Sequence, residues 1–209
     1  MPPSPDGPEP RRSPLITWVG LALISGGLFV YFLIDPRGLD GTEGQQHPSV
    51  GRVLPALQVE PLTGDILPTS LDSLQGKVVL VNFWGPWCHY CLVEFPHLVQ
   101  LERRLRDRDD FRLLAISCEM DLSREDLDGL QQRTEDYLRR SGADLPTYAD
   151  PGAVSRQAMM MVTGMEGFGY PTTVLLDRQG VIRGMWLGYR AGYEREMSRM
   201  IDQLLDAET

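Results

Sequence analysis

The sequence is poor in cysteine and in histidine, with three residues of each kind among 209. So few cysteines exclude a small disulfide-rich scaffold, and two of them, Cys88 and Cys91, stand three positions apart, a spacing that indicates chemistry rather than structural bridging. A structural zinc site needs four ligands, but Cys88, Cys91 and His89 are neighbours without a second pair at ligand spacing. We therefore expect no metal, and no cofactor other than a redox-active Cys88–Cys91 disulfide.

Positive charge is also in deficit. The chain carries 20 Lys and Arg against 29 Asp and Glu, a net charge of −9. Such an acidic chain lacks the basic face that binds nucleic-acid phosphates. The composition therefore argues against a nucleic-acid partner, and no internal repeat is present.

Charged side chains are absent from one long stretch, residues 15–34. At about 1.5 Å per residue, this stretch matches a hydrocarbon core about 30 Å thick. Trp18 and Tyr31 lie near its two ends, where aromatic residues favour the membrane interfaces. The alternative is a cleaved signal peptide, but the apolar region of such a peptide is usually about 7–15 residues long and ends at small residues. We predict a retained transmembrane anchor.

The flanks of this anchor indicate its orientation. Residues 1–14 are rich in Pro, Ser and charge, which is typical of a disordered tail. Arg11 and Arg12 precede the span while only Arg37 follows closely, which favours a cytoplasmic N-terminus. Residues 35–49 are rich in Gly and Pro and predict a flexible linker. We expect a single-pass protein of the inner (cytoplasmic) membrane with its C-terminal domain on the extracytoplasmic, periplasmic side.

Residues 50–209 alternate between strand-like and helix-like patterns and form the one expected domain. A βαβ unit followed by a β-hairpin and a helix predicts an α/β fold, a thioredoxin-like three-layer sandwich with an N-terminal β-hairpin extension and a helical insertion. The expected elements are hairpin strands at 56–62 and 66–70, a buried strand at Lys77–Trp84, a helix after the cysteine pair, a strand at Phe111–Ser117, a helix from a Ser123–Asp126 capping box to Gly142, a short helix from Asp150 through Met161, a hairpin at 172–187 and a helix at Glu194–Leu205.

The segment FWGPWCHYC joins the first buried strand to the helix that follows it. Cys88 is expected at the helix N-terminus, where the helix dipole and free N–H groups favour a thiolate. The three-residue step lets Cys91 reach back, form a disulfide with Cys88 and resolve a mixed disulfide. A C-x-x-C at a strand-to-helix junction within a βαβ pattern therefore predicts a redox-active pair.

A family resemblance is carried by three segments: LDSLQGKVVLVNFW, VNFWGPWCHYCLVEFPHL and GFGYPTTVLLDRQGVI. Together they resemble the TlpA-like branch of the thioredoxin-fold oxidoreductases (TlpA, ResA and DsbE types), over residues 50–205. The resemblance implies a membrane-anchored thiol-disulfide oxidoreductase that reduces protein disulfides, in apocytochrome c maturation or at metal-site cysteines. It also implies protein thiol and disulfide substrates and a membrane electron donor of the DsbD or CcdA type.

The resemblance further implies roles for single residues. Cys88 is the attacking cysteine, and Cys91 is the resolving, more buried one. Pro171 is expected to follow a cis peptide bond. Tyr170, which precedes it, would offer backbone groups to a bound peptide, and Trp87 beside the cysteine pair would also belong to the substrate site.

Glu94 matches the acid of the E-x-P element in this family. A partly buried glutamate with a raised pKa could pass a proton to or from Cys91. The alternative is a solvated first-turn carboxylate that interacts with the helix dipole. In thioredoxin itself an acid stands on the strand before the motif, and the matching position here is Asn82.

The two residues between the cysteines depart from the family. Many relatives carry Pro before the second cysteine, where this chain has Tyr90. An imidazolium at His89 would stabilise the thiolate and make the disulfide more oxidising, whereas an outward-pointing His89 would not. These departures leave open a disulfide-forming oxidase or isomerase. In a different class, a non-turnover metallochaperone or redox-sensing module also stays open.

Cys118 and Gly85 bear on two further questions, whether there is a third redox thiol and whether the chain could be a peroxiredoxin. Cys118 ends the second buried strand at the active-site edge of the sheet, as either a third redox thiol or, more often for a lone cysteine on an apolar strand, a small buried hydrophobe. A peroxiredoxin would need Thr three residues before its cysteine, where this chain has Gly85.

Overall fold

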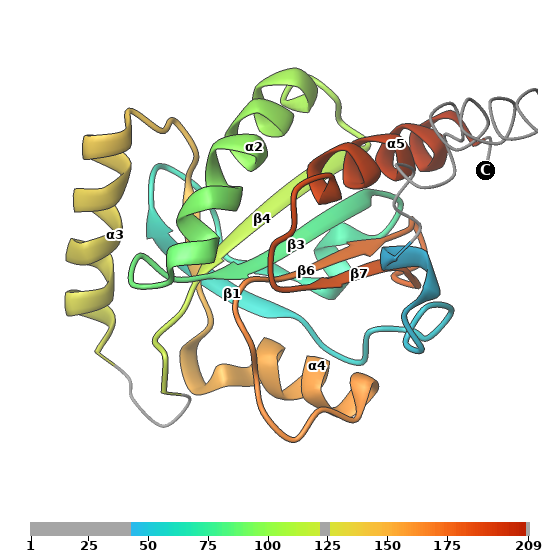
Figure 1. Cartoon of the computed structure of the whole chain (residues 1–209), viewed down its shortest axis with the longest axis horizontal. Helices are drawn as coiled ribbons and strands as arrows, with labels where there is room; N and C mark the ends of the chain where they lie inside the picture. The colour runs from blue at the N-terminus through green and yellow to red at the C-terminus, as the bar shows by residue number, and fades with distance from the viewer. Residues whose placement is uncertain (1–42, 122–125, 208–209) are drawn as a thin grey trace, which may run out of the picture. The chain divides into compact units, whose positions relative to one another are not determined.

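The computed structural model describes residues 43–121 and 126–207 (Figure 1). The predicted tail at 1–14 and the predicted anchor at 15–34 lie outside these residues, as does most of the predicted linker. In the part of the chain that is described, no helix is long and apolar enough to cross a membrane.

A seven-stranded mixed sheet forms the centre of the domain, in the order β2-β1-β5-β4-β3-β6-β7. β3 (Val78–Trp84) lies parallel to β4 (Phe111–Ser117) and antiparallel to β6 (Thr172–Leu176). All 7 residues of β3 are buried, as its nearly continuous apolar sequence predicts for a strand covered on both faces. The other strands are β1 (Gln58–Thr63), β2 (Thr69–Ser70), β5 (Thr147–Ala149) and β7 (Ile182–Leu187).

Helices cover both faces of this sheet. Figure 1 shows α2 (His89–Leu105) and α5 (Tyr193–Asp206) above the sheet and α4 (Val154–Thr163) below it. α3 (Leu127–Ser141) lies to the left in the same view. Short 3-10 turns are η2 (Gly44–Gln46), η3 (Leu71–Leu74) and η4 (Pro151–Ala153).

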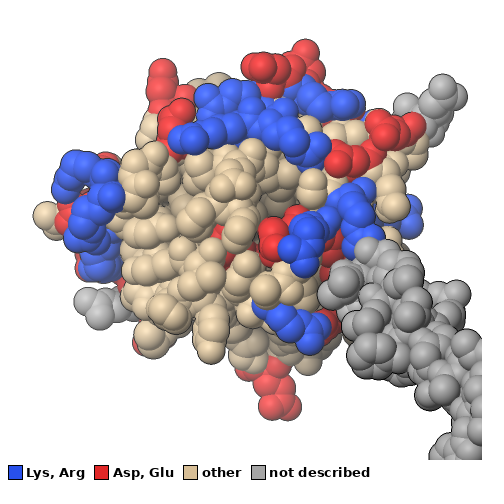
Figure 2. Space-filling view, turned by 45° about the horizontal axis from the view of Figure 1, so that its top comes forward, with Lys and Arg blue, Asp and Glu red and all other residues tan. Residues whose placement is uncertain are grey.

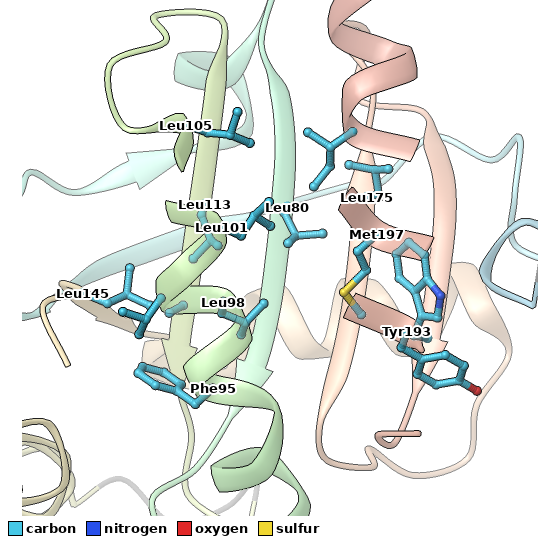
Figure 3. Packing of buried hydrophobic residues seen from close by; sticks show 14 of the residues in the cluster. Leu80, Phe95, Leu98, Leu101, Leu105, Leu113, Leu145, Leu175, Tyr193 and Met197 are labelled. Atoms are coloured by element: carbon cyan, nitrogen blue, oxygen red, sulfur yellow. The ribbon is translucent and has the colours of Figure 1, made fainter. Parts of the chain in front are cut away.

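The hydrophobic core has one layer on each face of the sheet. On one face Leu80 of β3 packs with Leu98 of α2 and Met197 of α5 (Figure 3). On the other face Val79 of β3 packs with Met159 of α4. Successive strand residues point to opposite faces, so the single apolar strand β3 serves both layers. This arrangement holds α2, and with it the cysteine pair, firmly above the centre of the sheet.

Most of the predicted elements are present. The buried strands β3 and β4, the C-terminal hairpin of β6 and β7, and the last helix α5 are confirmed. The predicted N-terminal hairpin also forms, but its second strand is short, because only Thr69 and Ser70 pair with β1. The α/β fold with helices on both faces follows from these elements.

Two features around residue 150 differ from the prediction. β5 was missed, because its 3 residues lie between Pro146 and Asp150 and are too few to show a period. The helix predicted from Asp150 is interrupted, since Gly152 and Ala153 have left-handed φ values of 64° and 55°. The first turn is therefore a separate 3-10 turn, and α4 begins only after it.

The start of α3 also differs. Asp126, predicted as the N3 residue of a capping box, is itself the N-cap, and its carboxylate accepts a hydrogen bond from the Gly129 N–H at 3.0 Å. Ser123, the predicted first residue of the box, lies outside the described residues. The helix ends as predicted, with Gly142 in the left-handed conformation at φ 64°.

The last residues of the predicted linker belong to the domain. The Gly44 N–H donates to one carboxylate oxygen of Glu196 at 3.1 Å, and the Trp186 indole N–H donates to the other at 3.1 Å. A Cβ on Gly44 would collide with the Trp186 ring. The boundary predicted at residue 50 is therefore too late, because the described chain is packed onto the domain from η2 onward.

Candidate functional site

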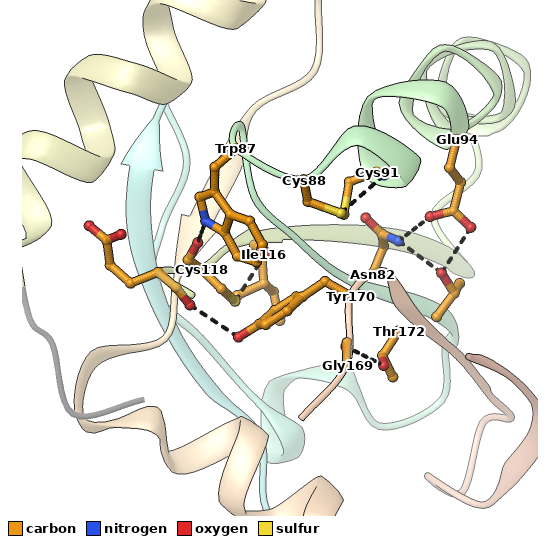
Figure 4. Close-up of a disulfide and its surroundings, with 12 residues drawn as sticks. Asn82, Trp87, Cys88, Cys91, Glu94, Ile116, Cys118, Gly169, Tyr170 and Thr172 are labelled. Atoms are coloured by element: carbon orange, nitrogen blue, oxygen red, sulfur yellow. Dashed lines mark hydrogen bonds between the residues drawn. A yellow bond between two sulfur atoms is a disulfide. The ribbon is translucent and has the colours of Figure 1, made fainter. Parts of the chain in front are cut away.

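A disulfide between Cys88 and Cys91 lies where β3 passes into α2 (Figure 4). Cys88 is the N-cap of α2, and its Sγ accepts a hydrogen bond from the Cys91 N–H at 3.2 Å. Cys88 is 7% exposed and Cys91 is 1% exposed. Cys88, which lies at the free N–H groups of the helix, is therefore the more accessible of the two cysteines, as an attacking cysteine requires.

The loop before the disulfide is closely packed against the end of β4. The Trp87 indole N–H donates to the Cys118 carbonyl at 2.9 Å. A Cβ on Gly85 would lie 2.5 Å from the Trp87 Nε1 and 2.9 Å from the Cys118 carbonyl oxygen. Position 85 therefore has no room for the threonine that a peroxiredoxin would need there.

The predicted substrate residues lie together beside the disulfide. The Tyr170–Pro171 peptide bond is cis, as the resemblance implies. The Tyr170 ring meets the Trp87 ring edge to face, with centroids 5.1 Å apart. Two aromatic side chains from segments far apart in the sequence thus form one rim next to Cys88.

A buried ion pair supports this rim, and the only part of it that the sequence pattern indicates is Asp150, as a helix cap. The Asp150 carboxylate accepts from the backbone N–H groups of Ser155 and Arg156 at 2.8 and 3.0 Å and from Arg156 Nε at 3.0 Å. Arg156 Nη1 donates to the Tyr170 hydroxyl at 3.1 Å, and this hydroxyl donates to the Glu119 carbonyl at 3.2 Å. The side chains of Arg156 and Asp150 are only 6% and 0% exposed.

Glu94 lies on α2 one turn after Cys91 and is buried, at 2% exposed. Burial raises its pKa from 4.5 to about 7, although hydrogen bonds from Asn82 at 2.8 Å and Thr173 at 3.2 Å partly oppose this shift. The solvated first-turn carboxylate, the alternative drawn from the sequence, is therefore wrong. A carboxyl group that titrates near neutral pH lies under the start of α2.

His89 and Tyr90 occupy the first turn of α2 and face outward. Both side chains are exposed, Tyr90 at 62%, and their rings lie edge to face with centroids 5.7 Å apart. His89 thus adopts the outward orientation that the sequence left as one alternative. The effect of both residues on the potential of the disulfide stays a prediction.

Cys118 is buried at the end of β4, with its Sγ 3.5 Å from the Ile116 carbonyl oxygen. Burial raises the pKa of this thiol to about 12. A thiol that remains protonated and enclosed is a poor nucleophile, which favours the small buried hydrophobe over a third redox thiol. In residues 43–121 and 126–207, no group of three or more His, Cys, Asp or Glu could hold a metal ion.

The surface near the disulfide carries exposed apolar side chains rather than charge. Tyr90 and Val93 of α2 are 62% and 42% exposed, and Leu187, which pairs with Thr172 next to Pro171, is 45% exposed. Figure 2 shows charged side chains at the top and left of the view and further charged groups right of centre and at the bottom, with an uncharged area between the top and left groups. This side of the molecule suits an uncharged stretch of polypeptide.

A comparison with protein families matches residues 50–185 to the AhpC/TSA family. Among curated proteins, the thiol:disulfide interchange protein DsbE of Pseudomonas aeruginosa is 27% identical, over 94% of this chain and 97% of its own. The thiol-disulfide oxidoreductase ResA of Bacillus anthracis is 25% identical, over 82% of this chain and 87% of its own.

Solved structures show the same fold. A thiol:disulfide interchange protein of the thioredoxin family from Chlorobium tepidum superposes with a TM-score of 0.56, at 22% identity over 73% of this chain and 95% of its own. A DsbF homologue from Corynebacterium diphtheriae gives a TM-score of 0.54, at 25% identity over 71% of this chain and 84% of its own. The thioredoxin-like α/β fold predicted from the sequence is thereby confirmed.

Proposed function

The chain belongs to the AhpC/TSA family and is a thiol-disulfide oxidoreductase of the ResA and DsbE type, and we propose that it reduces disulfides of protein substrates outside the cytoplasm. The observation that carries this proposal is the Cys88–Cys91 disulfide at the start of α2 beside cis-Pro171. The more accessible cysteine stands where a thiolate is stabilised, and the partner needed to resolve a mixed disulfide is one helical turn away.

In the reducing direction the pair begins as a dithiol. The Cys88 thiolate attacks one sulfur of the substrate disulfide, so that a mixed disulfide forms and the other substrate sulfur leaves as a thiolate. Cys91 then attacks the Cys88 sulfur, which releases the second substrate sulfur and closes the Cys88–Cys91 disulfide. The two electrons have passed to the substrate, and its two sulfurs take up protons to become thiols.

Glu94 is the proposed proton acceptor in this resolution step. Cys91 must lose its proton to become a nucleophile, and a carboxylate with a pKa of about 7 accepts a proton readily near neutral pH. Trp87 and Tyr170 form the rim of the substrate site, and the backbone before Pro171 is available to pair with an extended substrate segment.

The wider setting of the reaction is also proposed. Residues 15–34 anchor the chain in the inner membrane, and the domain lies on the periplasmic side. A membrane dithiol donor of the DsbD or CcdA type reduces the Cys88–Cys91 disulfide again after each turnover. The substrates are protein disulfides such as those of apocytochrome c or of cysteine metal sites. The names of two relatives, a thiol:disulfide interchange protein and a thiol-disulfide oxidoreductase, support the exchange of disulfides with other proteins.

Replacement of the resolving cysteine tests the exchange mechanism. Full-length Cys91→Ala, expressed in its native membrane, should accumulate mixed disulfides through Cys88, which appear as slower bands on non-reducing gels and vanish with reductant. Cys88→Ala is the matched control, since it removes the attacking sulfur and should give none of these bands. Equal band patterns from both variants would contradict the proposed mechanism.

The reduction potential decides the direction of electron flow. A value near −270 mV, as for thioredoxin, supports the reductase, whereas a value near −120 mV supports a disulfide-forming oxidase. The exposed His89 next to Cys88 is the feature that favours the oxidase, so His89→Ala should then lower the potential. Tight metal retention by the dithiol without exchange activity would instead favour a metallochaperone.

A further inference from the structure

Asn82 is the buried polar residue of β3 that faces the start of α2. It is 0% exposed and alternates with Leu80 and Trp84, whose side chains pack in the core layer under α2 together with Cys91. Its side-chain amide lies between Glu94 and the disulfide in Figure 4. The proposed mechanism above assigns it no task.

Three hydrogen bonds fix the orientation of the Asn82 amide. Its Nδ2 donates to Glu94 Oε2 at 2.8 Å and to Thr173 Oγ1 at 2.8 Å. The Thr173 hydroxyl uses its own hydrogen to donate to Glu94 Oε1 at 3.2 Å. Both N–H groups of Asn82 are therefore occupied, and a flipped amide would place its oxygen against the Glu94 carboxylate.

The oxygen of the same amide has no hydrogen-bond partner. Among the described residues, Asn82 Oδ1 is one of three buried side-chain polar atoms without one. Buried acceptors normally have a donor, and an exception calls for an explanation. In Figure 4 this oxygen points toward the disulfide, whose sulfurs carry no hydrogen to donate.

Reduction supplies the missing donor. When two electrons and two protons convert the disulfide into two thiols, Cys91 gains a hydrogen in a site that is only 1% exposed. We propose that Asn82 Oδ1 accepts the hydrogen bond of the Cys91 thiol in the reduced protein. The electrons come from the dithiol of the membrane donor, which becomes a disulfide. This inference rests on the proposed function, because it assumes that the pair cycles between both states.

The consequence is a preference for the reduced state. Asn82 Oδ1 is unsatisfied in the disulfide form and satisfied in the dithiol form, so the amide makes the pair easier to reduce. The same amide also donates to Glu94, and thus connects the resolving thiol to the proposed proton acceptor through one rigid side chain.

The reduction potential of Asn82→Ala tests the proposal. Against glutathione, the full-length variant should form its dithiol with an equilibrium constant about tenfold lower than the unaltered chain, a potential about 30 mV more negative. Thr173→Val is the matched control. It removes one hydrogen bond from Glu94 and one from Asn82 Nδ2, but it keeps Asn82 Oδ1 and the bond from Asn82 to Glu94 that orients the amide. This control should keep its potential within about 10 mV.

Each outcome of this measurement has one meaning. An unchanged potential in Asn82→Ala, or an equal shift in Thr173→Val, overturns the role of Oδ1, while the exchange chemistry of the unaltered chain stands. If the unaltered chain shows no reversible equilibrium with glutathione, the proposed function itself fails. A shift only in Asn82→Ala supports the inference.

Vibrational spectroscopy tests the bond directly, and its decisive outcome comes from a protein that keeps Asn82. In Cys118→Ala with Cys88 alkylated, Cys91 carries the single thiol of a chain with 3 cysteines. Its S–H stretch should lie at lower frequency than that of a thiol in an apolar solvent, because a hydrogen bond weakens the S–H bond. The band should move up in Asn82→Ala and stay in Thr173→Val. A band at the apolar-solvent position in the unaltered Asn82 background contradicts the inference.

Discussion

Burial of Glu94 makes the stability of the oxidised domain depend on pH. Its folded pKa of about 7 lies above the ordinary value of 4.5, so the folded protein holds this proton more tightly than the unfolded chain does. The contribution of this proton to the unfolding free energy is fully present below about pH 4.5. It is lost as the pH rises through about 7, which lowers the unfolding free energy by about 3 kcal/mol. Glu94→Gln stays neutral at every pH and should lack this loss.

Urea unfolding of both proteins in the oxidised state measures the effect. Between about pH 4.5 and about pH 8, the unfolding free energy of Glu94→Gln should rise by about 3 kcal/mol relative to that of the unaltered chain. Other groups titrate in the same way in both proteins, so the difference isolates Glu94. Parallel pH curves would show that the carboxyl group is not held neutral by its surroundings.

The Arg156–Asp150 pair is the second residue-scale feature with a measurable effect. Arg156→Met would leave the Asp150 carboxylate, whose side chain is 0% exposed, without its cation. Loss of one partner from a buried pair costs about 3–5 kcal/mol, and we expect an unfolding free energy lower by that amount in urea.

An exposed pair provides the control for this change. Arg104 and Asp202 are 2.8 Å apart with both side chains 44% exposed, so Arg104→Met should cost no more than about 1 kcal/mol. Equal losses from the two arginine variants would mean that Asp150 tolerates an unpaired charge, contrary to its complete burial.

The site residues that can be predicted from the sequence are those marked by a short motif or spacing. Cys88 and Cys91 are found by their spacing, and Pro171 by the segment that resembles the family. Thr173, the β6 partner of Glu94, has no such signal, because 79 residues separate the two in the sequence. Arg156 has none either, because its contact with Asp150, 6 residues away, depends on how the side chains pack. The sequence marks Asn82 only as the position where thioredoxin has an acid, whereas the hydrogen bonds of its amide depend on Glu94 and Thr173, which other segments supply.

At the scale of elements, long periodic segments were predictable and short ones were not. β3 is apolar apart from Asn82 and α5 has a strongly one-sided pattern, so both follow from the sequence. β5 has 3 residues, and its place between β1 and β4 comes from tertiary pairing. The break before α4 at Ala153 is a case in which tertiary packing imposes a backbone conformation that alanine rarely adopts.

The end of α3 permits a test of one local signal. Gly142 has a φ of 64° and open space around its Cβ position, so Gly142→Ala changes only the backbone preference. We expect a loss of about 1 kcal/mol in unfolding free energy. Gly167 also has open space but no left-handed φ, and Gly167→Ala should be neutral or stabilising by up to about 1 kcal/mol. If both changes had equal effects on the unfolding free energy, the left-handed φ would not explain why glycine stands at position 142.

At the scale of the whole molecule, the start of the domain bears on how it is attached. η2 is held by Glu196 and covers Trp186, so the chain leaves the domain at a fixed point on the side of β7 and α5. Only residues 35–42 then separate this point from the predicted anchor. If residues 15–34 span the membrane as proposed, a linker this short would keep the domain close to the membrane, within reach of the proposed membrane donor.

The last prediction concerns the anchor proposed at residues 15–34. If these 20 uncharged residues span the membrane with Arg11 and Arg12 in the cytoplasm, the chain should remain in the membrane after carbonate extraction. Its reduced Cys88 should then react with a membrane-impermeant maleimide added to intact spheroplasts. The double change Leu23→Arg with Ile24→Arg adds about 5–7 kcal/mol to the insertion free energy. It should therefore release the chain into the carbonate-soluble fraction and protect Cys88 from the reagent. If Cys88 of the unaltered chain reacts only after the membrane is permeabilised, the domain lies in the cytoplasm, and a periplasmic reductase is ruled out even though the exchange chemistry stands.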